Sequence, residues 1–119
     1  MKVLIADGSA LIRNRLIDSL KDNKDIEIIG QAKNAIETIA ALWKLNPDTV
    51  VMDIQMPTGS GIEVLQSIKK HKPSTCVIVL TSSDDPAYRE KCMALGAHSF
   101  LDKATEFYRV AEILKGLSP

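Results

Sequence analysis

The sequence predicts an α/β fold in which a doubly wound sheet of five parallel strands carries helices on both faces. Five short apolar runs of strand length alternate with segments whose apolar residues recur at helical spacing. No linker-like segment interrupts this alternation, and 119 residues suffice for one hydrophobic core but not for two. We therefore expect a single domain over residues 1–119, with no output domain in this sequence.

The expected strands are the apolar runs 3–6, 26–31, 49–52, 77–80 and 98–101. The first, third and fourth runs are uniformly apolar, which is typical of parallel strands buried on both faces, whereas the second and fifth include polar residues. Of the two common doubly wound orders, only the flavodoxin-like order 2-1-3-4-5 places these three strands inside a five-stranded sheet. Its ligand crevice lies between the first and third strands.

The expected helices begin at capping side chains and carry apolar stripes. Ser9, Asn34, Ser60 and Asp85 are the predicted N-caps, and Gly96 marks a helix end. The stripes that we expect to cover the sheet are Ile12, Leu16 and Leu20; Ile36, Ile39, Ala40 and Trp43; Ile62, Leu65 and Ile68; and Phe107, Val110, Ala111, Leu114 and Leu117.

The composition excludes several classes of protein. Fifteen basic residues balance fifteen acidic ones without a basic stripe, so we expect no direct binding to nucleic acid. No apolar stretch approaches the roughly 20 residues of a membrane span, and the start lacks a signal pattern, which indicates a cytoplasmic protein without a membrane partner. Cys76, Cys92, His71 and His98 lack zinc-site spacing, and we expect both cysteines to be buried.

Four reactive side chains stand at the ends of predicted strands: Asp7, Asp53, Thr81 and Lys103. The carboxyl ends of parallel strands joined by right-handed crossovers meet at one edge, where open α/β folds bind ligands. Each residue alone has a plain structural interpretation, such as an ion pair between Asp53 and Lys103 or a helix cap by Asp7. Their convergence on one edge favours a functional site.

Two carboxylates beside an ammonium and a hydroxyl suit phosphoryl transfer onto an acid. Asp7 and Asp53 could supply the protein's share of an octahedral Mg²⁺ site, and Asp53 would also be the nucleophile. Lys103 offers a positive charge and Thr81 a hydroxyl to the phosphoryl oxygens.

Four segments together resemble the receiver domains of two-component response regulators, similar in fold to the chemotaxis response regulator. They are residues 3–7, residues 51–57 with Gly61 after them, residues 80–82 and residues 100–103, and the resemblance covers nearly the whole chain. It implies a signalling switch rather than an enzyme with a separate substrate.

The resemblance implies that Asp53 is the phosphoacceptor, charged by a histidine kinase, a histidine phosphotransfer protein or a small acyl phosphate. It implies Mg²⁺ bound by Asp7, Asp53 and the carbonyl of Gln55. It also implies that Thr81 and Phe100 move together on phosphorylation, although Phe100 is equally well interpreted as an ordinary aromatic of an edge strand. The movement would remodel the face of the fourth helix, fifth strand and fifth helix, where a downstream target, a fused output domain or a second receiver docks.

One position departs from the family pattern. Receivers usually carry two adjacent acids after the first strand, and the second is Gly8 here. The missing acid is a direct metal ligand, so we expect weakened Mg²⁺ binding, with water or Asp84 as a substitute ligand. The lost charge also removes a repulsion on Asp53, on the order of 3 kcal/mol at an effective dielectric near 20, but the lost ligand outweighs it. Gln55 and Ser83 would flank the path of a hydrolytic water without deprotonating it.

Several alternatives remain open. A hydrolase using an aspartyl-phosphate needs an acid where Gln55 stands, and a flavodoxin-like cofactor carrier needs a phosphate loop where Asp7 would repel the phosphate. The stronger alternative is a pseudo-receiver, a phosphorylation-independent interaction module, for which Gly8 is the evidence. Residues 26–41 and 102–107 also look like receivers that precede helix-turn-helix domains, which favours a fragment of a DNA-binding response regulator.

Overall fold

The computed structural model describes residues 1–83 and 85–118 and contains one parallel sheet in the order β2-β1-β3-β4-β5. The strands are β1 (Lys2–Ala6), β2 (Glu27–Ala32), β3 (Thr49–Met52), β4 (Cys76–Thr81) and β5 (Ser99–Asp102). The helices are α1 (Ala10–Leu20), α2 (Ala35–Leu45), α3 (Gly61–His71), α4 (Pro86–Ala94) and α5 (Arg109–Leu117). The predicted fold class and strand order are confirmed.

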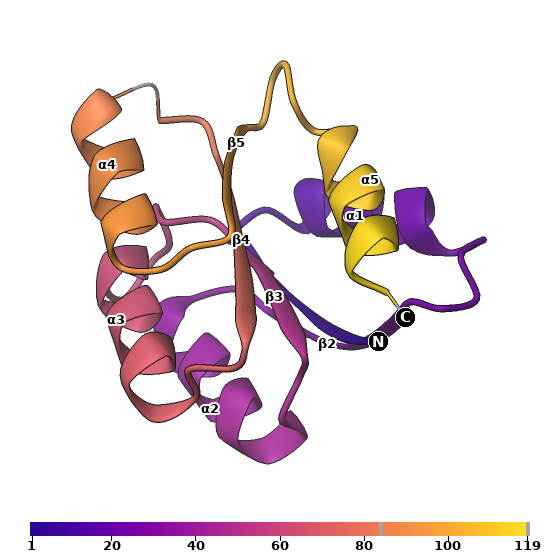
Figure 1. Cartoon of the computed structure of the whole chain (residues 1–119), viewed down its shortest axis with the longest axis horizontal. Helices are drawn as coiled ribbons and strands as arrows, with labels where there is room; N and C mark the ends of the chain where they lie inside the picture. The colour runs from indigo at the N-terminus through magenta and orange to yellow at the C-terminus, as the bar shows by residue number, and fades with distance from the viewer. Residues whose placement is uncertain (84, 119) are drawn as a thin grey trace.

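The sheet separates two hydrophobic cores (Figure 1). Helices α1 and α5 cover one face, where Ile5, Leu80 and Leu114 belong to one buried cluster. Helices α2, α3 and α4 cover the other face, where Met52 and Leu65 belong to the second cluster. The alternation of side chains along each strand assigns successive residues to opposite cores, so β1, β3 and β4 are buried on both faces.

The predicted caps are confirmed, and they fix the loops at the carboxyl edge of the sheet. The side-chain oxygens of Ser9, Asn34, Ser60 and Asp85 accept hydrogen bonds from the main-chain N–H groups of Ile12, Glu37, Ile62 and Ala87, respectively. Gly96, just after α4, has a φ of 102°, which suits glycine. Four helices therefore start from defined geometry beside the strand ends.

The predicted buried face of α2 is wrong except at Ile39, which is partly buried against the core. The helix packs Ala35, Thr38 and Leu42 inward, whereas Ile36 is 67% exposed and Trp43 is 58% exposed. The predicted stripe and the buried stripe are offset by one residue, which is about 100° around a helix. The apolar pattern of the sequence contains both stripes and therefore does not show which one packs on the sheet.

Two smaller expectations also change. Cys92 is buried as predicted, but Cys76 is only half-buried at the start of β4. Burial raises the pKa of both thiols, which keeps them protonated and unreactive at neutral pH. Phe107, predicted as part of the last helical stripe, precedes α5 and lies under Arg15, whose Cζ is 4.2 Å from the ring centroid.

The loop after β3 is held tightly against the start of α3. The Gly61 N–H donates to the Ile54 carbonyl at 3.0 Å, and a Cβ on Gly61 would lie 2.3 Å from Ile54 Cα, so only glycine fits there. Thr58 and Gly59 take positive φ values of 59° and 136° to close the loop. These constraints fix the backbone that carries Asp53.

Candidate functional site

Asp7 and Asp53 lie at the carboxyl ends of the neighbouring strands β1 and β3. Main-chain hydrogen bonds continue the sheet ladder into both residues, from Asp7 N–H to the Ala32 carbonyl at 2.9 Å and from Asp53 N–H to the Ala6 carbonyl at 3.0 Å. Asp7 is 3% and Asp53 5% exposed. The sheet therefore brings two nearly buried carboxylates together at its central crevice.

Lys103 bridges the two carboxylates. Its Nζ lies 2.6 Å from Asp53 Oδ2 and 2.7 Å from Asp7 Oδ2. The other carboxylate oxygens accept main-chain N–H groups, Asp7 Oδ1 from Ser9 at 2.9 Å and Asp53 Oδ1 from Gln55 at 2.9 Å. Each carboxylate oxygen thus has a donor, which offsets the cost of burying two acids.

The charge of Lys103 is stabilised by its two partners. Burial by itself would lower the pKa of the ammonium, but the hydrogen bonds and the negative charges of Asp53 and Asp7 outweigh it and raise the pKa above its usual value. Lys103 therefore stays protonated at neutral pH.

Thr81 ends β4 beside the cluster and is fully buried. Its carbonyl accepts the Lys103 N–H at 3.0 Å, which ties β4 to the residue that bridges the acids. Its hydroxyl accepts the Ser83 N–H at 3.3 Å. The structure thus places Thr81 at the predicted edge, with its hydroxyl engaged by its own loop.

Phe100 lies apart from the acid cluster. It pairs with Val79 across β4 and β5 and is buried on the sheet face covered by α2, α3 and α4. Arg89 of α4 lies over its ring, with Cζ 5.0 Å from the centroid. A hollow of about 270 Å³ adjoins the ring, between Ser83, Asp85 and Pro86 on one side and Asp102 on the other. The ring therefore has open space next to it, toward the loop after β4.

Sequence reasoning missed Arg13, which holds the backbone of the site. Its Nη1 donates to the Asp7 carbonyl at 2.6 Å, and its Nε donates to Gln31 Oε1 at 3.1 Å. Arg13 stands four residues after the helix cap Ser9, a spacing that returns a long side chain to the start of the helix. That spacing was the available signal for a role in positioning Asp7.

The donors at this edge fit a hard divalent cation in part. Carboxylate oxygens are the ligands that Mg²⁺ prefers, but both carboxylates here contact Lys103 Nζ, and the described residues contain no cluster of three or more metal-ligating acids, histidines or cysteines. Gly8 is exposed, and a Cβ there would lie 3.1 Å from Pro57 Cδ, a contact that a small shift relieves. Asp84, the expected substitute ligand, lies outside the described residues.

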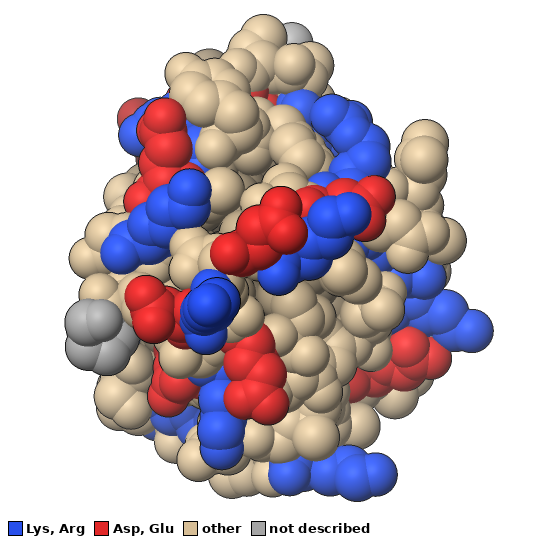
Figure 2. Space-filling model, turned by 90° about the vertical axis from the view of Figure 1, so that its right-hand side faces the viewer, with Lys and Arg blue, Asp and Glu red and all other residues tan. Residues whose placement is uncertain are grey.

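The face formed by α1 and α5 carries interspersed charges of both signs (Figure 2). This distribution agrees with the zero net charge of the chain and gives this face no basic patch for a nucleic acid backbone. Among residues 1–83 and 85–118, no helix is long and apolar enough to cross a membrane.

Comparison with known proteins identifies the family. The family model of the response regulator receiver domain matches residues 3–115. The chain belongs to this family. It is 37% identical over 118 residues to the transcriptional regulatory protein BtsR of Escherichia coli K12, and 34% identical over 115 residues to the uncharacterized transcriptional regulatory protein YvfU of Bacillus subtilis. It is also 33% identical over 115 residues to a protein-glutamate methylesterase/protein-glutamine glutaminase of Clostridium acetobutylicum.

These matches cover 98%, 97% and 95% of the chain but only 48%, 58% and 33% of the three relatives.

Solved receiver domains confirm the fold. The isolated receiver domain of RcsB from Salmonella enterica serovar Typhimurium, in the presence of phosphomimetic BeF3⁻, has a TM-score of 0.92 at 28% identity, with 98% of this chain and 87% of that chain covered. The response regulator domain of Thermotoga maritima CheB has a TM-score of 0.85 at 33% identity, with coverages of 98% and 92%.

Proposed function

We propose that this receiver domain is a phosphoacceptor switch of a two-component system in which Asp53 takes the phosphoryl group. The observation that carries the proposal is the position of Lys103, whose ammonium lies between Asp7 and Asp53 at 2.7 and 2.6 Å. A buried acid with a cation at hand can accept a phosphoryl group without leaving the added negative charge unbalanced. Family membership supports this function over an unrelated use of the same fold.

In the proposed reaction, an oxygen of Asp53 attacks the phosphorus of a phosphohistidine or a small acyl phosphate. The new bond joins the Asp53 carboxylate to phosphorus, and the bond from phosphorus to the donor's nitrogen or oxygen breaks, with its electron pair leaving on the donor. The Lys103 ammonium stabilises the negative charge that develops on the phosphoryl oxygens. The main-chain N–H of Gln55 keeps the other Asp53 oxygen oriented.

Asp7, Asp53 and the carbonyl of Gln55 are the proposed Mg²⁺ ligands. When bound, Mg²⁺ neutralises charge on the transferring phosphoryl group and orients it. Because Gly8 supplies no carboxylate, we propose that this site binds Mg²⁺ more weakly than a site with a second acid there. Lys103 then supplies a larger share of the charge balance.

The proposed output of the switch runs through Thr81 and Phe100. A phosphoryl group on Asp53 offers new acceptors to the Thr81 hydroxyl, which now accepts from Ser83. Movement of Thr81 would allow the Phe100 ring to shift into the hollow beside it, and Arg89 links that ring to the loop before α5, with its Nη2 4.0 Å from Glu106 Oε1. The face of α4, β5 and α5 would change as a result.

The proposed partners are a histidine kinase or histidine phosphotransfer protein in the cytoplasm, together with a downstream protein or a fused output domain. Among the relatives, BtsR and YvfU are transcriptional regulatory proteins of which the match covers 48% and 58%. We propose that any DNA contact belongs to such an output domain, because the receiver has no net positive charge. The domain catalyses at most its own phosphorylation and dephosphorylation.

The proposal is tested by intact-mass measurement after incubation with acetyl phosphate across a Mg²⁺ titration. One phosphoryl adduct per chain, lost on denaturation at alkaline pH as acyl phosphates are, is the expected result. A folded protein that forms no adduct at any Mg²⁺ concentration, with acetyl phosphate or with a phosphorylated histidine kinase, would contradict it.

The substitution Gly8→Asp tests the weakened metal site. The new carboxylate adds a third acid, so we expect the Mg²⁺ concentration for half-maximal phosphorylation to fall about tenfold, equivalent to about 1.4 kcal/mol of metal binding. The Mg²⁺ titration of the phosphorylation rate measures it, with Gly8→Asn as the uncharged control. An unchanged Mg²⁺ requirement would show that residue 8 does not reach the metal.

The second candidate function is a pseudo-receiver that binds its partner without phosphorylation. Gly8 is the observation that favours it. In that case Asp7, Asp53 and Lys103 form a structural cluster only, and partner binding is the same with and without acetyl phosphate.

A further inference from the structure

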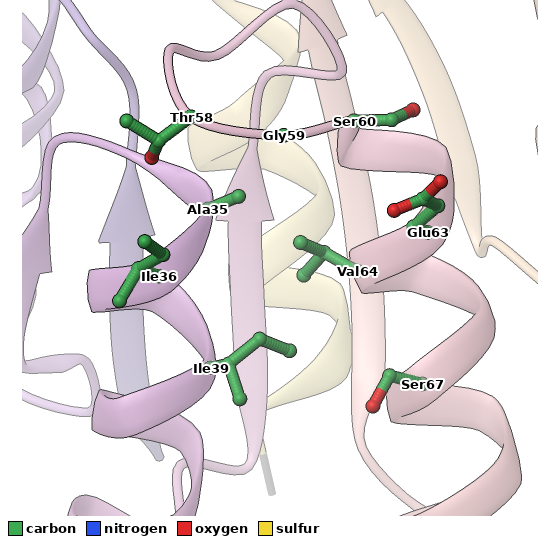
Figure 3. Close-up of a pocket in the computed structure, with 9 residues that line it drawn as sticks. All are labelled: Ala35, Ile36, Ile39, Thr58, Gly59, Ser60, Glu63, Val64 and Ser67. Carbon is green, nitrogen blue, oxygen red and sulfur yellow. The ribbon is translucent and has the colours of Figure 1, made fainter.

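Helix α2 leaves an apolar stripe uncovered beside α3. Ile36 and Trp43, seven residues apart on α2, are both more than half exposed, and Ile39, between them, is partly buried against the core. Ile39 of α2 and Val64 of α3 point toward each other across a groove between the two helices (Figure 3). We call this the α2–α3 groove. Beside the N-terminal halves of the two helices it opens into a hollow of about 410 Å³. Exposed apolar grooves of this kind mark contact surfaces.

Trp43 extends the apolar surface beyond this hollow. Ile39 and Ser67 line the hollow and also a small recess of about 10 Å³ with Trp43, His71 and Lys72. Lys72 Nζ lies 4.7 Å from the centre of the Trp43 ring and donates to Asn46 Oδ1 at 2.9 Å, which holds the indole near the end of α2. The exposed apolar surface therefore runs from Ile36 in the first turn of α2 to Trp43 in its last turn.

The two ends of the groove carry opposite charges. Helices α2 and α3 run in the same direction on the same face of the sheet (Figures 1 and 3). Glu63, in the first turn of α3, lines the hollow, and Lys72, which caps α3, lines the recess beside Trp43. Glu37 and Lys44 stand in the first and last turns of α2, outside both linings. The surface is therefore acidic at one end, apolar in the middle and basic at the other end.

We propose that the α2–α3 groove is a dimer interface, occupied by the same groove of a second copy with its helices antiparallel. A two-fold axis across the helices, near Ile39 and Ser67, brings α2 against α2 and α3 against α3. Ile36 then faces Trp43 of the second copy, and Glu63 faces Lys72 of the second copy.

The charge pattern argues for a second copy. Two-fold symmetry requires the surface to be complementary to itself, and the antiparallel arrangement places each acidic end on a basic end. A parallel arrangement would set acid on acid. The dimer uses residues outside the Asp53 cluster and a face other than α4, β5 and α5, so it is independent of the proposed phosphorylation.

Sedimentation equilibrium of the unphosphorylated domain, from about 10 μM to about 1 mM, tests the proposal in the range of weak protein association. We expect a monomer–dimer equilibrium within this range. Trp43 is the only tryptophan of the chain, so its emission should shift to shorter wavelength over the same concentrations as the ring leaves water. A monomer at all concentrations would overturn the proposal.

A charge exchange tests the geometry. Glu63→Lys and Lys72→Glu should each weaken the dimer about tenfold, because each sets like charges together, and the double variant should restore it. Leu11→Ala, at an exposed apolar residue of α1 on the opposite side of the sheet, is the matched control and should leave the dimer unchanged. A double variant as weak as the singles, or a dimer that Leu11→Ala dissolves, would overturn the proposed arrangement. Circular dichroism checks that all variants are folded.

Discussion

Asp53→Asn is expected to abolish the phosphoryl adduct completely. The amide has nearly the same shape as the carboxylate but carries no negative charge, so it cannot attack phosphorus as the acid does. Its carbonyl oxygen can still accept the hydrogen bond that Lys103 now donates at 2.6 Å, and the fold should therefore persist. Intact mass after incubation with acetyl phosphate and excess Mg²⁺ measures the effect.

The matched control is Asp102→Asn. Asp102 ends β5 at the same edge of the sheet, but it is half-exposed and bonds its own loop, through the Ala104 N–H at 3.2 Å and the Thr105 hydroxyl at 2.8 Å. We expect this variant to be phosphorylated like the unsubstituted chain. An adduct on Asp53→Asn in similar yield would mean that another residue is the acceptor.

Lys103→Met is expected to slow phosphorylation about a hundredfold or more. Methionine preserves much of the aliphatic stem but removes the only ammonium that contacts Asp7 and Asp53 among the described residues. Removal of one fixed electrostatic stabiliser of a transition state typically costs a factor of 10² to 10³. The rate of adduct formation, followed by mass, measures the loss, and Lys91→Met on the exposed side of α4 is the control. An unchanged rate would remove Lys103 from the mechanism.

The same substitution should destabilise the folded domain at neutral pH by about 3 kcal/mol, because two nearly buried carboxylates lose their counter-charge. The pKa of Lys103 is raised in the folded state, so its stabilising effect is complete below the ordinary lysine pKa of about 10.4 and is lost as the pH rises through the higher folded value. The difference in unfolding free energy between the unsubstituted chain and Lys103→Met should therefore be constant from neutral pH to about pH 10 and shrink above it. Urea unfolding at several pH values measures it; a difference that grows with pH would contradict this account.

The site was predictable as a set of residues because its members stand at strand ends. Asp7, Asp53, Thr81 and Lys103 follow apolar runs, and parallel topology brings such positions to one edge whatever the loops do. The hydrogen bonds within the set were not predictable. The ammonium of Lys103 forms ion pairs with both Asp7 and Asp53. This geometry depends on the direction in which the turn after β5 sends a flexible side chain.

Arg13 illustrates a contact that residue spacing could have suggested. Its guanidinium reaches the Asp7 carbonyl from the first turn of α1, a local contact within six residues. Charged residues of exposed helix turns usually extend into solvent, and the second hydrogen bond of Arg13, to Gln31 on β2, is the part that the tertiary structure adds.

The sequence by itself determined the number of strands, their order, the helix caps and the edge on which the reactive residues gather. These follow from the periodicity of apolar residues, from hydrogen bonds between residues close in the chain and from topological rules that hold for parallel sheets in general. Only the tertiary structure decided which stripe of α2 packs on the sheet and which stays exposed. That choice is made by contacts of Ala35, Thr38 and Leu42 with residues far away in the chain, and two apolar stripes one residue apart are nearly equivalent until those contacts form.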